Sequence, residues 1–279
     1  MLKVVFFVEQ KQNLHIHTMY ADGKDTPEEM ILEAIGRGFS SIGFSEHSYM
    51  SFSSYPHQMT VEKAEDYKRE VRALKEKYKG KLDVFCGLEL ELFSDVPTDG
   101  FDYLIGSAHY LKIGDEILGF DRGYDETLAY VNTHFAGDGL CFAKQYFETV
   151  VQLPEKGKID ILGHFDIITK NNEKGNFIDV SDENYLKMGF DAIHALGGKI
   201  PLFEVNTGAI SRGYRTSPYP QIEFLREFHR CGFGAVITSD CHDKNHIDCF
   251  YTEAEELLRT AGFSSKWILT EDGFREVAL

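Results

Sequence analysis

Short apolar runs that end in polar residues recur along the chain and alternate with segments of helical periodicity. Runs of this length and composition predict β-strands, and the amphipathic segments between them predict helices. Seven strands are expected, over residues 11–17, 41–46, 82–90, 103–108, 159–163, 199–205 and 234–238. The apolar opening run, residues 1–8, is expected to lead into the first of these strands.

The helical segments have recognisable starts. Thr26 is a favoured N-cap, Pro27 suits the first helical position and Glu29 can close a capping box. The apolar face of this helix is expected to comprise Met30, Ile31, Ala34 and Ile35. Further helices are expected over residues 60–78, 124–150, 181–196, 220–231 and 252–260. Alternation of strand and helix predicts parallel strands joined by crossover helices.

Polar side chains stand near the C-terminal end of each predicted strand. They are His15 and His17, Glu46 and His47, Glu89, His109, His164, Glu204 and Asn206, and Asp240 and His242. In a parallel barrel all these ends converge on one face, whereas an open sheet gathers only those beside its switch point. The pattern therefore favours a closed α/β barrel. No linker or repeat interrupts the sequence, which predicts one domain over residues 1–279.

Composition narrows the class of protein. The apolar runs are too short for a membrane span, so no membrane association is expected. Five cysteines without a Cys-x-x-Cys pair suggest neither a disulfide framework nor a zinc ribbon, and favour a cytoplasmic protein. The formal net charge of -16, without a Lys/Arg block, disfavours nucleic-acid binding and points to a small-molecule substrate. The sequence predicts no particular oligomeric state.

The strand-end residues suggest a metal site. In an extended strand His15 and His17 face the same side, so they can bind one ion together, although His-x-His alone could equally be two unrelated histidines. With Asp22 there are nine candidate ligands: His15, His17, Asp22, His47, Glu89, His109, His164, Asp240 and His242. Nine exceed the need of one ion, and the donor types suit zinc, iron or manganese. Two or three divalent ions are expected, with Glu89 as a bridge.

Residues 13–23, with the later strand-end motifs in the same order, resemble the polymerase and histidinol phosphatase (PHP) superfamily. Residues 204–220 and 119–122 are similar to the corresponding segments of its histidinol-phosphate phosphatases of histidine biosynthesis. The resemblance implies a distorted seven-stranded (β/α)7 TIM-like barrel with a trinuclear site. The implied ligand groups are His15, His17, Glu89 and Asp240; Glu89, His109 and His164; and Asp22, His47 and His242. Asp22 stands where some relatives have histidine.

The function hypothesis is hydrolysis of L-histidinol phosphate by a metal-bound hydroxide between the first two ions. Glu89, Asp240 and His242 are the expected catalytic residues; Asp240 or a bound water would relay the proton, and the third ion would shield the leaving group. Basic loop residues are expected to hold the phosphate: Lys112, Arg122, Arg212 and Arg215. Glu204 is the expected partner of the substrate ammonium.

Two alternatives stay open. A PHP phosphoesterase acting on nucleotides or oligonucleotide ends would use the same metals with another pocket. A noncatalytic metal-binding module would be expected to lack some ligands. The other histidines are interpreted as structural or solvated, with His246 as the first exception to consider: His57, His134, His194, His229 and His246. The insertion at residues 114–158 is a candidate cap over the pocket.

Overall fold

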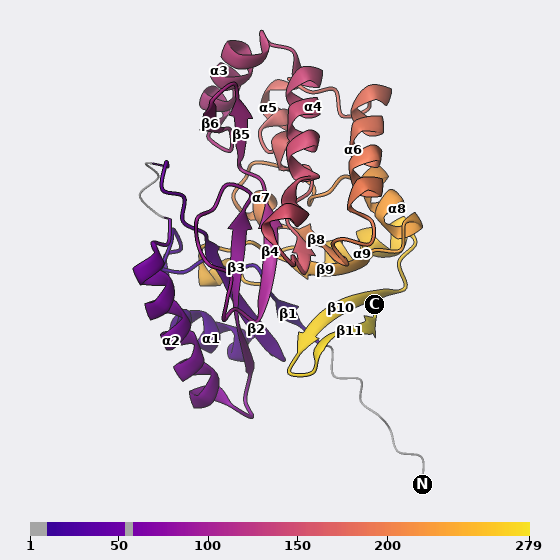
Figure 1. Ribbon diagram of the computed structural model, residues 1–279. Coiled ribbons are helices and arrows are strands. Elements are labelled where there is room, and N and C mark those ends of the chain that lie inside the picture. The colour runs from indigo at the N-terminus through magenta and orange to yellow at the C-terminus, as the bar shows by residue number, and fades with distance from the viewer. Residues whose placement is uncertain (1–9, 54–57) are drawn as a thin grey trace.

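The computed structural model describes residues 10–53 and 58–279 (Figure 1). The expected strand at residues 1–8 and the histidine at position 57 lie outside these residues. Seven parallel strands form the main sheet in the order β1-β2-β3-β4-β7-β8-β9. Their bounds are β1 Gln12–Asn13, β2 Ser41–His47, β3 Asp83–Glu91, β4 Tyr103–Ser107, β7 Ile161–Leu162, β8 Leu202–Asn206 and β9 Gly234–Thr238.

The sheet closes between its first and last strands. Just beyond β1 and β9, Ile16 and Cys241 form a parallel bridge. The His17 N–H donates to the Cys241 carbonyl at 3.0 Å, and the Cys241 N–H donates to the His15 carbonyl at 3.3 Å. The seven strands therefore make a nearly closed barrel, which confirms the predicted fold. Several strands are shorter than expected, β1 most of all, with two residues against the seven predicted.

A tyrosine fills the barrel interior. Tyr103 on β4 is 1% exposed, and its hydroxyl donates to the carbonyls of Leu14 and Phe44. The ring fits only because glycine occupies the facing positions on β2 and β3. A Cβ at Gly87 would lie 2.2 Å from the ring, and a Cβ at Gly43 would lie 2.5 Å from the hydroxyl oxygen. The ring thus ties three strands together beneath the strand ends.

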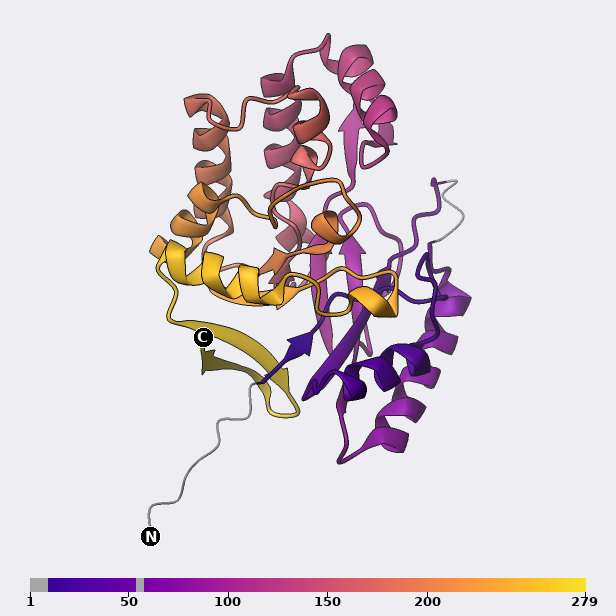
Figure 2. The same ribbon diagram turned by 180° about the vertical axis from the view of Figure 1, so that it is seen from behind.

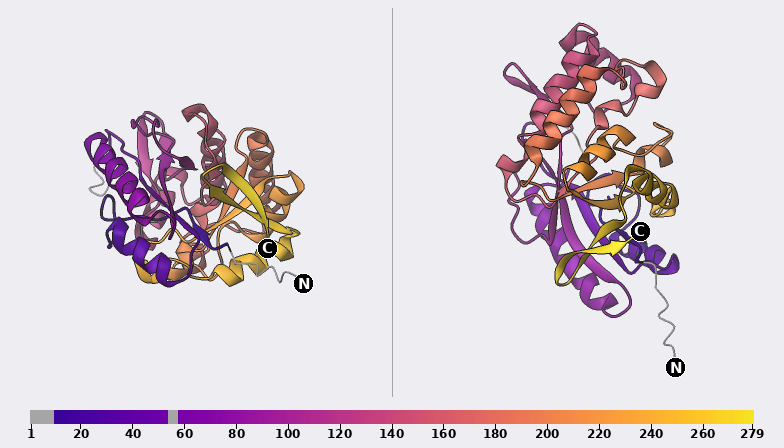
Figure 3. Two further views of the ribbon diagram at one scale, coloured as in Figure 1. Left: turned by 90° about the horizontal axis from the view of Figure 1, so that it is seen from below. Right: turned by 90° about the vertical axis from the view of Figure 1, so that its right-hand side faces the viewer.

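A C-terminal hairpin, which the sequence pattern did not predict, lies across the opposite end of the barrel (Figure 3). It consists of β10 Ser265–Thr270 and β11 Gly273–Ala278. The Gln12 side chain pairs with the backbone of Leu269, donating to its carbonyl and accepting from its N–H, both at 2.8 Å. From behind, β1 runs beside this hairpin (Figure 2). Because Leu269 also joins the interior apolar cluster, the hairpin seals this end.

The helices cover the outside of the barrel. The longer ones are α1 Pro27–Gly36, α2 Val61–Tyr78, α3 Tyr124–Phe135, α4 Gly139–Val150, α6 Glu183–Leu196, α8 Ile222–Arg230 and α9 Tyr251–Ala261; α5 Asn172–Gly175 and α7 Gly208–Ser211 are single turns. The Thr26–Glu29 capping box of α1 is confirmed. Within the described residues, no helix is long and apolar enough to cross a membrane.

The insertion after β4 differs from its prediction. The expected single helix at 124–150 is wrong: it breaks at Ala136 and Gly137, which both have positive φ, and Asp138 caps the start of α4. Before α3 the chain forms an antiparallel hairpin of β5 Tyr110–Ile113 and β6 Glu116–Gly119. The hairpin and these helices stand above the strand ends in Figure 1, and Tyr110 of β5 and Gly119 of β6 line a pocket over the strand ends.

Candidate metal centre and active site

The strand ends bring the predicted metal ligands together at one end of the barrel. His15 and His17 lie in the segment that closes β1 against β9, with ring centroids 5.1 Å apart. His47 ends β2, and Glu89 lies near the end of β3. The others follow their strands closely: His109 after β4, His164 after β7, and Asp240 and His242 after β9. The barrel thus converts separate strand-end motifs into one cluster.

Glu89 occupies the centre of this cluster, with its carboxylate 1% exposed. Five histidines surround it, with His15, His109 and His164 toward Oε1 and His17 and His47 toward Oε2. The shortest approaches are 2.9 Å from Oε1 to His164 Nε2 and 2.6 Å from Oε2 to His47 Nδ1. A buried carboxylate with imidazoles at both oxygens is suited to bridge two ions.

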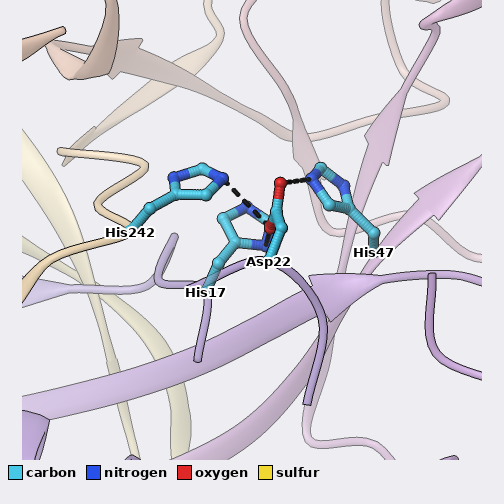
Figure 4. A group of neighbouring side chains, drawn as sticks. All are labelled: His17, Asp22, His47 and His242. Atoms are coloured by element: carbon cyan, nitrogen blue, oxygen red, sulfur yellow. Dashed lines mark ion pairs between the residues drawn. The ribbon is translucent and has the colours of Figure 1, made fainter. Parts of the chain in front are cut away.

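Asp22 extends the cluster and lies between His47 and His242 (Figure 4). Its Oδ2 is 3.5 Å from His47 Nε2, and its Oδ1 is 3.2 Å from His242 Nε2. Glu46 anchors the start of the loop that carries Asp22, because its carboxylate accepts hydrogen bonds from the N–H and hydroxyl of Thr18. Burial raises the pKa of Glu46 to about 8, although these hydrogen bonds oppose the shift. We assign Glu46 a positioning role that its sequence context did not reveal.

Eight of the nine predicted ligands fall into three overlapping groups, in each of which one ligand atom per residue lies within 4.8 Å of the others, and His109 belongs to none of these groups. The groups are His17, Asp22, His47 and His242; His15, Glu89 and His164; and His15, His17 and Asp240. Nε2 of His15 and Nε2 of His17 are buried and make no hydrogen bond to any described residue. Such nitrogens are costly in a protein interior, and coordination would satisfy them. The residues present therefore fit divalent metal ions.

Carboxylates and imidazoles in the cluster shift one another's pKa values. Burial alone would raise the pKa of Glu89, but the surrounding His47, His109 and His15 hold it well below its ordinary value. Burial would likewise lower the pKa of His15, yet the charges of Glu204, Asp240 and Glu89 raise it well above 6.5. These opposite shifts in pKa favour ionised carboxylates beside a protonated His15 in the metal-free protein.

Glu204 on β8 supports two of the ligands from behind. Its Oε2 accepts hydrogen bonds from His15 Nδ1 at 2.9 Å and from the Thr238 hydroxyl at 2.8 Å. Its Oε1 accepts from the His164 N–H at 2.6 Å and from Asn206 Nδ2 at 2.9 Å. The residue is 1% exposed, so a substrate ammonium cannot reach its carboxylate, and the predicted contact is wrong. Glu204 instead fixes the tautomer of His15 and leaves its Nε2 available to a metal.

Glu91 plays a similar part on β3. Its Oε2 accepts from the backbone N–H of His109 at 2.7 Å and lies 3.2 Å from His109 Nδ1. The contact directs His109 Nε2 toward Glu89, 3.5 Å away. Strand alternation places Glu91 on the same side as Glu89, which was the available sequence signal.

A family model described as the PHP domain matches residues 13–199, more than half of the chain. The chain belongs to the PHP domain family. The matched range contains seven of the nine predicted ligands, and only Asp240 and His242 lie beyond it. Those two join the PHP cluster through the closure of the barrel.

Relatives of this PHP chain extend over nearly its whole length. A protein from Deinococcus radiodurans is 28% identical over 264 residues, covering 89% of this chain and 92% of its own. The histidinol-phosphatase of Bacillus subtilis is 24% identical, covering 87% and 97%. The histidinol phosphate phosphatase of Lactococcus lactis, solved with zinc, L-histidinol and phosphate, has a TM-score of 0.70 at 20% identity, covering 95% of this chain and 99% of that one. The structural likeness supports the PHP barrel fold.

A pocket of about 270 Å³ opens over the PHP metal ligands. Its floor includes most of the cluster, whereas His15 and His17 are fully buried beneath it. Three basic residues line its wall: Arg122, Lys170 and Arg212. Arg212 donates to Asp240 Oδ2 at 2.9 Å, and Lys170 donates to Asp121 Oδ1 at 2.8 Å. The sequence pattern did not single out Lys170, six residues after His164, or Asp121, directly before Arg122.

Two expected phosphate contacts are corrected. Lys112 lies on the exposed side of β5 and does not line the pocket. Arg215 also lies off the pocket: its Nη1 donates to the Thr169 hydroxyl at 2.6 Å and lies 3.8 Å from Asp166 Oδ2, with the guanidinium 4.5 Å from the centre of the Tyr219 ring. Arg215 therefore braces the chain behind the site.

The described histidines that were expected to be structural or solvated lie outside the metal-ligand cluster. His134, His229 and His246 belong to no group of potential ligands among the described residues, whereas His194 does, on the outer helices. Cys241 is buried, as expected, and its sulfur lies 4.0 Å from Asn13 Nδ2. No thiol contributes to the three ligand groups of the barrel.

Proposed function

We propose that this PHP chain is a metal-dependent phosphomonoesterase that hydrolyses L-histidinol phosphate to L-histidinol and phosphate. The observation that carries the proposal is the convergence of nine imidazole and carboxylate side chains, with Glu89 at their centre, beneath a pocket with three basic residues. The Bacillus subtilis relative named histidinol-phosphatase supports the substrate, as does the Lactococcus lactis relative solved with zinc, L-histidinol and phosphate.

The proposed cofactors are two or three divalent ions of zinc, iron or manganese. His15, His17, Glu89 and Asp240 would hold one, Glu89 with His109 and His164 a second, and Asp22 with His47 and His242 a third. Ions bound there would supply an activated water and neutralise phosphoryl charge. Glu89 would serve both of the first two sites, because its Oε1 lies 2.9 Å from His164 Nε2 of the second and its Oε2 lies 3.6 Å from His17 Nε2 of the first.

The basic wall of the pocket is proposed to orient the phosphate. Arg212 and Arg122 present guanidinium groups, which can bind two phosphate oxygens at once, and Lys170 adds a point charge. Lys170 replaces the expected Lys112 and Arg215 in this role. Arg212 also holds Asp240, so its movement toward phosphate would couple substrate binding to that ligand.

Asp240 is proposed to accept the proton of the attacking water. Burial would raise its pKa, but Arg212 and His15 hold the pKa well below the ordinary value, so the carboxylate is ionised at neutral pH. Oδ1 faces His17 Nε2 at 3.2 Å and Oδ2 accepts from Arg212. Its backbone has φ 44°, a sparsely populated conformation for a residue with a side chain, as is common at active sites.

Recognition of the organic half of the substrate is proposed to involve Asp121. Its carboxylate lines the pocket next to Lys170, where it can meet a cationic ammonium or imidazolium group. This assignment replaces Glu204, whose carboxylate has all its hydrogen bonds inside the protein.

The test is phosphate release by protein reconstituted with zinc, iron or manganese, comparing L-histidinol phosphate with nucleoside monophosphates. We expect the higher kcat/KM for L-histidinol phosphate. Preference for nucleotides would favour the nucleotide phosphoesterase, and full metal content without hydrolysis of either substrate would favour the noncatalytic module. His134→Ala, on the exposed side of α3, is the matched control for ligand variants and should keep full activity.

A further inference from the structure

A second group of potential metal ligands lies on the outer helices, away from the strand ends. His194 lies in the last turn of α6, Glu227 lies on α8, and Cys231 follows directly as the C-cap of α8. One ligand atom from each lies within 4.8 Å of the others. None of the three contributes to the PHP cluster, so the group is independent of the proposed phosphatase.

A single carboxylate oxygen organises this group. Glu227 Oε1 is 2.5 Å from His194 Nε2 and 3.7 Å from Cys231 Sγ. The other oxygen, Oε2, accepts from the Arg230 guanidinium. The Glu227 side chain is only 4% exposed, so its charge is buried between the two helices. Arg230 leaves Oε1 directed at the imidazole and the thiol.

These separations can be compared with a tetrahedral zinc site. With Zn–S of about 2.3 Å and Zn–O or Zn–N of about 2.0–2.1 Å, sulfur and oxygen ligands lie about 3.6 Å apart, and nitrogen and oxygen ligands about 3.3 Å. The observed 3.7 Å between Cys231 Sγ and Glu227 Oε1 matches the first value. His194 must move outward by about 1 Å to match the second. Its side chain is 54% exposed, so it has room.

The helix termini and the donor chemistry favour zinc, against the positive charge that Arg230 places on Glu227 Oε2. Both helices direct their C-terminal ends, which carry partial negative charge, toward the group. Thiolate, imidazole and carboxylate together form a borderline-soft donor set that suits zinc. We propose that His194, Glu227 and Cys231 form a separate zinc site that joins α6 to α8, with water as the fourth ligand.

Cobalt(II) titration of the metal-free chain under reducing conditions tests the proposal. The PHP cluster offers only nitrogen and oxygen donors, so a thiolate-to-cobalt charge-transfer band in the near ultraviolet reports the second site. We expect this band in the wild type, its loss in Cys231→Ser and its weakening in His194→Gln. Cys141→Ser, at the other exposed cysteine, should retain it. Zinc content at saturation should fall by one equivalent in Cys231→Ser, with phosphate release unchanged.

Three results would overturn the proposal: no near-ultraviolet band in the wild type, an unchanged band in Cys231→Ser, or equal loss in Cys141→Ser. Circular dichroism of each variant separates ligand loss from unfolding. Because the cobalt readout does not depend on hydrolysis, a negative result in the phosphatase assay leaves this test intact, and the converse also holds.

Discussion

Replacing Glu204 by glutamine would remove one charge from behind the metal cluster while keeping the shape of the side chain. The carboxylate accepts four hydrogen bonds, two at each oxygen. An amide can accept only at its oxygen, and its NH2 group is a donor. In the glutamine variant, the NH2 group must therefore replace either Oε1 or Oε2, and it would face groups that donate hydrogen bonds to that oxygen in the native protein.

Either orientation of the glutamine amide disturbs a ligand. If its NH2 faces His15 Nδ1, the imidazole must switch tautomer, and the proton on Nε2 then blocks coordination. If the NH2 faces the other way, it opposes the backbone N–H of His164 and the amide of Asn206. The native contacts at these positions are short, 2.9 Å to His15 and 2.6 Å to His164. Neither arrangement restores the native geometry.

The expected cost is a loss of about 10- to 100-fold in zinc affinity. This corresponds to about 1.4–2.7 kcal/mol. Competition with a chelator of known affinity measures it, and Glu256→Gln, at an exposed position on α9, is the control. Unchanged zinc affinity in Glu204→Gln, with normal folding, would refute the positioning role of Glu204.

The same variant should change how metal binding depends on pH. Glu204, Asp240 and Glu89 raise the pKa of His15 in the metal-free protein, so an ion must displace a proton from it. Affinity is therefore expected to rise with pH until His15 is deprotonated. Without the charge of Glu204 that pKa falls, and the rise should shift to lower pH. An identical pH profile in wild type and variant would contradict this.

The remaining predictions concern a metal ligand, a residue proposed to bind the phosphate, and a glycine in the loop that carries Asp22. His17→Ala should abolish phosphate release and lower metal content with an unchanged circular dichroism spectrum; full activity would refute its role. Arg212→Gln should lower kcat/KM by about 100-fold, which steady-state kinetics would measure. Gly23→Ala should cost about 1–3 kcal/mol in thermal unfolding, because its Cβ would lie 2.2 Å from the His17 carbonyl oxygen. Gly36→Ala, with open space around it, should be neutral or stabilising.

The barrel and the metal ligands were predictable because they depend on strand ends. Parallel strands deliver their C-terminal residues to one face whatever the details of the helices. His15 and Asp240, which are 225 positions apart, could therefore be assigned to one cluster before any distance was known. The sequence could not show which groups each carboxylate faces and hydrogen-bonds. Glu204 and Asp121 are both acidic residues near the site, but only the fold turns one inward and the other toward the pocket.

Two features of the insertion after β4 could not be predicted, because one is short and the other depends on backbone conformation. The β5–β6 hairpin turns at Gly114 and Asp115, a dipeptide typical of tight hairpins, but its strands have only four residues each. The break between α3 and α4 rests on Ala136 in the left-handed region, which alanine rarely adopts. Helical periodicity continues across this break, so pattern alone predicts one helix.

Anomalous diffraction from zinc-loaded crystals, recorded at the zinc edge, would show whether metal ions bind beside Glu89. The account predicts two or three peaks at the barrel centre, with Glu89 contacting two of them and His15, His17 and Asp240 around one. The peak proposed between α6 and α8 would be separate from these. Absence of any peak beside Glu89 in a fully loaded crystal would contradict the account.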